Sequence, residues 1–112
     1  MFQTMPGAVT PLGNWNVTLT AVAQTLDALI KNAIVPSAAG LPVGARHFVL
    51  ITEGAVGARW SDAAPDCAAP SSGTLLPAGV PLEVWNADAR ILLMKFCRDG
   101  GANTTASLWV GK

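Results

Sequence analysis

Few residues of this 112-residue chain carry side chains that could take part in catalysis. His47 is the only histidine, so no second imidazole can share a metal ion with it or relay its proton. A catalytic histidine needs an orienting partner such as a carboxylate, which only the fold could supply. We therefore interpret His47 as an ordinary strand residue, and we expect neither a metal site nor a cofactor.

The acidic and hydroxyl side chains point to no particular reaction either. Two of the seven acidic residues could cleave a glycosidic bond at the right separation, but most of the seven lie at predicted strand ends or loops. Solvated and turn-forming acids are common at such places. No serine lies in a Gly-x-Ser-x-Gly nucleophile motif, and no phosphate-binding glycine loop is present. We predict that the protein is not an enzyme.

The chain has four tryptophans and no tyrosine. Exposed aromatic rings on a sheet can stack on sugars, which leaves a carbohydrate-binding module as an alternative. Each tryptophan lies within a predicted strand, however, where such a large side chain usually fills a core or a subunit interface. We favour the core or interface interpretation for Trp15, Trp60, Trp85 and Trp109.

The composition predicts association with other proteins. Only 12% of residues are charged, against about 25% in ordinary domains, while 51% are hydrophobic and the formal net charge is zero. Proteins with few charges and exposed apolar surface tend to associate, so we expect a homo-oligomer or a subunit of a larger assembly. The absence of a basic run argues against direct nucleic-acid binding.

No apolar stretch is long enough to span a membrane, and the first residues do not form a signal peptide. We therefore expect no membrane contact and synthesis in a cytoplasm. In that compartment Cys67 and Cys97 are expected to be free thiols.

One domain is expected, preceded by an extended arm. Residues 1–13 are rich in proline and glycine, which resist helix and sheet pairing. Residues 14–112 form the domain. The apolar spacing predicts one short N-terminal helix at about residues 20–33, with Thr20 as its N-cap and Pro36 beyond its end.

The rest of the domain is predicted to consist of six or seven short strands. Residues 47–52 are apolar on both strand faces and are followed by a hairpin at Gly54. The last third reads as a β-meander with strands at residues 80–85, 91–98 and 104–110. This pattern predicts a mainly β fold, namely a small antiparallel β-sandwich or a jelly-roll-like barrel.

Several short motifs carry a resemblance to a known group of proteins. They are Thr18-Leu19-Thr20-Ala21 with Gln24 and Leu26, Arg59-Trp60-Ser61-Asp62, Gly73 to Leu82 with its Pro77-Ala78-Gly79 turn, Asp88, Ile91 to Phe96, and Thr104 to Val110. In this order they resemble small virion proteins of tailed bacteriophages. The chain departs from that group at its end, where Gly111-Lys112 replaces aromatic residues.

The resemblance implies a small β-sandwich that decorates or cements a phage capsid. Its partners would be copies of itself, with a trimer at capsid three-fold positions as one arrangement, and the major capsid protein or other virion proteins. Its location would be the virion, made in the host cytoplasm. A tail or baseplate component, or a carbohydrate-binding receptor-recognition module, is the alternative. The expected interface residues are Met1, Phe2, Met5, Trp15, Phe48, Leu50, Trp85 and Trp109.

Overall fold

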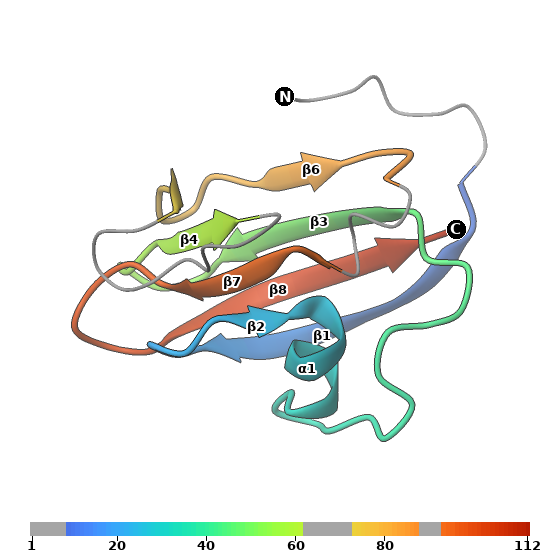
Figure 1. Cartoon of the computed structure of the whole chain (residues 1–112), viewed down its shortest axis with the longest axis horizontal. Helices are drawn as coiled ribbons and strands as arrows, with labels where there is room; N and C mark the ends of the chain where they lie inside the picture. Colours follow the sequence, from blue (N-terminus) through green and yellow to red (C-terminus); the bar gives the residue numbers. More distant parts are fainter. Residues whose placement is uncertain (1–8, 62–72, 88–92) are drawn as a thin grey trace.

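The computed structural model describes residues 9–61, 73–87 and 93–112, which form two facing antiparallel sheets and one short helix (Figure 1). This confirms the expected mainly β fold. Sheet A has the strand order β1 (Pro11–Leu19), β8 (Thr104–Gly111), β3 (His47–Thr52) and β6 (Leu82–Val84). Sheet B has the order β2 (Gln24–Thr25), β7 (Lys95–Arg98), β4 (Ala58–Ser61) and β5 (Thr74–Leu76).

The inner face of sheet A follows the two-residue period of its strands. Burial alternates along β8, so that every second side chain from Thr104 to Val110 is buried. The register sets Phe48 opposite Val110 and Leu50 opposite Leu108, so these apolar side chains share one face. This face supplies half of the hydrophobic core.

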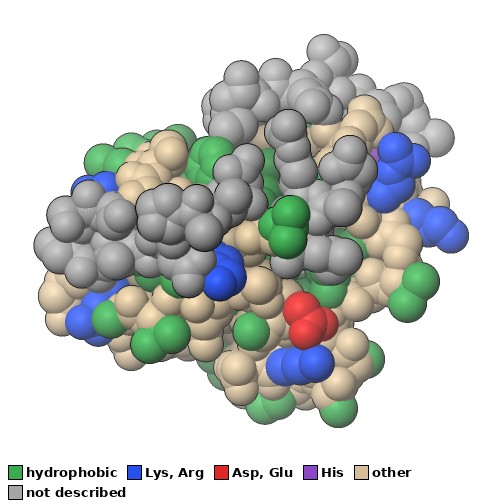
Figure 2. All heavy atoms as spheres, viewed as in Figure 1, with side chains coloured by type: hydrophobic (Ala, Val, Ile, Leu, Met, Phe, Trp, Pro, Cys, Tyr) green, Lys and Arg blue, Asp and Glu red, His purple; other side chains and the backbone are tan. Residues whose placement is uncertain are grey.

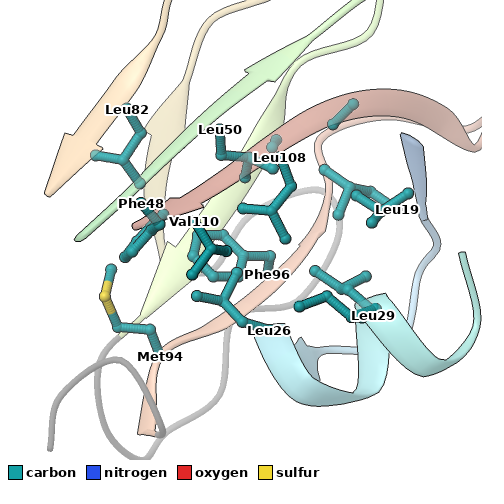
Figure 3. Close-up of a cluster of buried hydrophobic side chains, with 14 of the residues drawn as sticks. Leu19, Leu26, Leu29, Phe48, Leu50, Leu82, Met94, Phe96, Leu108 and Val110 are labelled. Atoms are coloured by element: carbon teal, nitrogen blue, oxygen red, sulfur yellow. The ribbon is translucent and has the colours of Figure 1, made fainter. Parts of the chain in front are cut away.

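Sheet B and the helix close the core from the other side. Phe96 of β7 meets Phe48 of β3 edge to face, with ring centroids 5.9 Å apart and an angle of 84° between the rings. Leu26 and Leu29 of the helix point into the same cluster, and Met94 covers its end near Phe48 (Figure 3). The two sheets therefore share one core.

The helix α1 (Leu26–Lys31) is shorter than the sequence predicts. Residues 24–25 pair with β7 as strand β2, so a helix cannot begin at Thr20. Thr20 caps only a local turn, in which its hydroxyl accepts a hydrogen bond from the Val22 N–H. Thr25 is the real N-cap, because its hydroxyl accepts from the Ala28 N–H at 3.2 Å.

The order of strands differs from the predicted meander and hairpin. Strand β3 lies in sheet A and β4 in sheet B, so no hairpin forms at Gly54. Likewise β6, β7 and β8 alternate between the two sheets and do not pair in sequence. Alternation predicts that one face of a strand is buried, but both sheets of a sandwich bury an inner face. The pattern therefore cannot tell which sheet a strand joins.

Two further boundaries differ from the sequence interpretation. Strand β1 begins at Pro11, because Pro11 pairs with Gly111. A bulge separates this pair from the next one, Gly13 with Val110. In the stretch expected as a strand at residues 91–98, strand β7 begins at Lys95, and residues 91–92 lie outside the described residues. Leu93 just before β7 is 59% exposed, while Met94 is buried in the core.

Candidate functional site

The outer face of sheet A carries a regular grid of polar and apolar side chains. Because successive strand residues point to opposite faces, Asn14 and Asn16 of β1 face outward while Val17 and Leu19 face the core. The register aligns the outward residues across β1, β8 and β3 in two rows, Asn14–Trp109–Val49 and Asn16–Ser107–Ile51. These rows form the floor of a groove.

The wall of the groove is the segment 34–37, which follows α1. The Ile34 N–H donates a hydrogen bond to the Asn16 carbonyl at 3.0 Å, so the segment is held against the open edge of β1. The hollow has a volume of about 670 Å³, and none of the described residues that line it is charged. Its size is that of an ordinary ligand pocket.

Trp109 is held in position by its neighbours on the outer face. Its ring centroid lies 5.9 Å from that of Trp85, which in turn lies 5.6 Å from the His47 ring. A side chain at Gly111, two residues along β8, would collide with the Trp109 ring. The glycine therefore leaves room for the indole to lie along the strand.

His47 has a structural role in this aromatic cluster. It is buried, and its Nδ1 accepts a hydrogen bond from the Asn86 N–H at 2.9 Å, so in the neutral ring the proton is on Nε2. Burial lowers the pKa of His47 below its usual 6.5, and the positive charge of Arg46 lowers it further. The ring is thus kept neutral at pH 7.

Several acidic side chains brace the fold by hydrogen bonds. Asp27 accepts from the Leu41 N–H at 2.9 Å and pairs with Lys31 at 3.1 Å. These two contacts, the backbone hydrogen bond first, lower the pKa of Asp27. Asp99 pairs with Arg59 at 2.6 Å across sheet B. Among the residues that the structure describes, no three His, Cys, Asp or Glu side chains gather as metal ligands would.

The expected interface residues fall in different environments. Phe48 and Leu50 are fully buried in the core, so their side chains have no surface to offer a partner. Trp85 is nearly buried, and Trp15 packs partly buried against the core. Trp15 and Trp109 both line the groove, and the register places Trp109 in its outward row beside Asn14. Met1, Phe2 and Met5 lie outside the described residues.

The amide residues of the groove were missed in the sequence analysis. The alternation that places Trp15 and Val17 on one face of β1 also places Asn14 and Asn16 together on the other. The sequence therefore contained a signal for the two asparagines. It contained none for Ser107 or the segment 34–37, because their place in the groove depends on strands distant in the sequence.

The two cysteines were expected to be free thiols. Cys97 is a free thiol that is completely buried in β7. Cys67 lies outside the described residues.

Comparison with protein-family models, with curated proteins and with solved structures gives no match. In the described part of the chain, no helix is long and apolar enough to cross a membrane.

Proposed function

We propose that the protein is a structural subunit of a tailed-bacteriophage virion, a decoration or cement protein that binds the head through protein contacts. The observation that supports binding through protein contacts is the exposure of large apolar side chains on a molecule with few charges. Val35 and Val43, between α1 and β3, are 79% and 97% exposed. Among the residues placed by the structure, the other exposed large apolar side chains are Val22, Ile34, Leu75, Val80 and Leu93.

The surface around these residues favours association. Figure 2 shows hydrophobic side chains reaching the surface at several places on one face, interspersed with Lys and Arg side chains and with uncharged surface. Apolar area of this kind stabilises a complex when a partner removes it from water. A net charge of zero means that copies of the chain repel one another little.

The proposed mechanism is reinforcement by repeated contacts. The sandwich is a rigid unit with one core, and each copy would add a modest apolar contact to the capsid lattice. Symmetry multiplies that contact, so weak individual binding becomes effective over the whole particle. The virion assignment itself comes from the motif resemblance, which the sandwich fold supports.

The test is the mass of the purified full chain by analytical ultracentrifugation, alone and with capsids assembled from a tailed-phage major capsid protein. We expect an oligomer or co-sedimentation with the capsids. A stable monomer that leaves the capsids bare would refute the proposal.

A charge placed on the exposed apolar segment should weaken this binding. Val43→Asp introduces one at a side chain that makes almost no contact within the monomer, so the fold should be unaffected. Capsid binding should fall about tenfold, because the partner would have to desolvate a carboxylate. Ala102→Asp adds the same charge at an exposed turn elsewhere and should change nothing. Equal binding by both variants would exclude the segment around Val43 as the contact surface.

A further inference from the structure

The groove on the outer face of sheet A has the chemistry of a ligand site. Its floor combines the Trp109 ring and the apolar Val49 and Ile51 with the amides of Asn14 and Asn16. Both asparagines are exposed, so their side chains are accessible to a ligand. A mixture of an aromatic surface with a few converging polar groups is typical of small-molecule sites.

The lack of charge in the lining narrows the class of ligand. A phosphate-bearing ligand would require basic side chains, and none lines the groove. A purely apolar ligand would bury the two asparagine amides without hydrogen-bond partners, which is costly. The remaining class is a neutral molecule that has both apolar faces and many hydroxyl groups.

Each polar side chain of the groove floor can form hydrogen bonds with the hydroxyl groups of a ligand. An asparagine amide can donate to one hydroxyl and accept from another. The Ser107 hydroxyl donates to the Glu53 carboxylate at the end of β3, so its oxygen remains able to accept a hydrogen bond. Since the register places Ser107 beside Asn16, both could contact the same ligand.

The aromatic part of the site is preorganised. Trp109 is held by Trp85 and lies over the bare backbone of Gly111, so its ring needs little ordering when a ligand binds. Such preorganisation lowers the entropic cost of binding. A fixed indole is also a suitable surface for the C–H face of a sugar ring.

We infer that this groove binds a neutral oligosaccharide, with one sugar unit on Trp109 beside Asn14 and the hydroxyls of a following unit bonded to Asn16 and Ser107. This inference goes beyond the structural role and does not depend on it. A decoration subunit with such a site would attach the particle to glycans while other surfaces hold it on the head.

The first experiment is a glycan array probed with the full-length protein, including neutral and acidic glycans. Neutral glycans bound on the array are then titrated in solution by tryptophan fluorescence and by ligand-observed NMR. We expect saturable binding of neutral saccharides that perturbs the tryptophan emission. Binding of no glycan, or of acidic glycans alone, would overturn the inference.

Matched variants locate the binding in the groove. Asn16→Ala and Ser107→Ala should each weaken the affinity about tenfold, because each removes a hydrogen-bonding group from the floor. Thr18→Ala is the control, since Thr18 is the next outward residue of β1 but does not line the groove. All three variants should keep the wild-type circular dichroism spectrum. Unchanged affinity in both groove variants would place the saccharide elsewhere and overturn the inference.

The result of the glycan-binding experiments is independent of the result of the capsid assay. Capsid binding without glycan binding would leave the structural proposal intact and remove the saccharide site. Hydrogen exchange on the decorated capsid adds a further check. Protection of the groove strands there, together with an empty glycan array, would assign the groove to a protein partner.

Discussion

Single residues on the outer face of sheet A have roles that depend on their partners. His47 was expected to be an ordinary strand residue, and it is the first residue of β3. Its burial, its contact with Trp85 and its hydrogen bond from Asn86 depend on a loop some forty positions away in the sequence. The residue is therefore a fixed, neutral part of the fold.

The neutral state of His47 predicts a specific pH dependence of stability. The pKa of His47 is lowered in the folded protein. At pH values between about 6.5 and that lower pKa, the unfolded chain therefore binds a proton that the folded chain does not. The free energy of unfolding should be fully retained above pH 6.5 and decrease as the pH falls through this window. Urea denaturation at pH 7.5, 6.5, 5.5 and 4.5 measures this free energy of unfolding.

His47→Asn is the control for this prediction, because an amide oxygen can also accept from the Asn86 N–H and does not titrate. The difference in stability between wild type and variant should change with pH only below 6.5. The contribution of Asp27, whose pKa is lowered in the folded state, is the same in both proteins and cancels in this difference. A difference that stays constant from pH 7.5 to 4.5 would contradict the prediction.

At the scale of elements, the beginning of α1 shows how tertiary pairing overrides local propensity. The apolar spacing from Val22 to Ala33 is helical, yet Val22 is 67% exposed and residues 24–25 pair with β7. Apolar spacing describes which residues could share a helical face. This spacing contains no information on the pairing of the same backbone groups with β7.

The two threonines at this end of the helix should differ in their effect on stability. Thr25→Ala removes the N-cap of α1 and should lower the free energy of unfolding by about 1 kcal/mol. Thr20→Ala removes only an exposed turn contact and should change it by less than about 0.5 kcal/mol. Urea denaturation of both variants at pH 7.5 measures the difference. A larger loss for Thr20→Ala would mean that the helix begins earlier in solution.

At the scale of the whole molecule, the chain crosses repeatedly between the two sheets. Among the strands that the structure describes, β4 and β5 are the only two successive strands that belong to the same sheet. The inner faces of both sheets and α1 contribute to one core cluster. Neither sheet can therefore bury its apolar face without the other.

This topology predicts that the domain unfolds in a single cooperative step. Tryptophan fluorescence reports mainly on side-chain packing, and far-ultraviolet circular dichroism reports on the strands. Both should give the same urea midpoint, with a slope of about 1–3 kcal/mol per molar urea. Separate midpoints at low protein concentration would show that one sheet can remain folded alone.

The sequence by itself determined the class of fold and the alternating faces of two strands. Alternation along residues 14–18 and 104–110 is a local property, because successive strand residues always point to opposite sides. It correctly indicated strands there, and it also put Asn14 and Asn16 on one face. The low charge and high apolar content are likewise readable without any structure.

Only the tertiary structure decided which sheet each strand joins and which side chains meet at the surface. The groove needs β1, β8, β3 and the segment 34–37, which come from four separate stretches of the sequence. Their arrangement is selected by the packing of two sheets around one core, a non-local balance that no short sequence pattern contains. For this reason Phe48 and Leu50 lie in the core, while Trp109 and Ser107 form the floor of the groove.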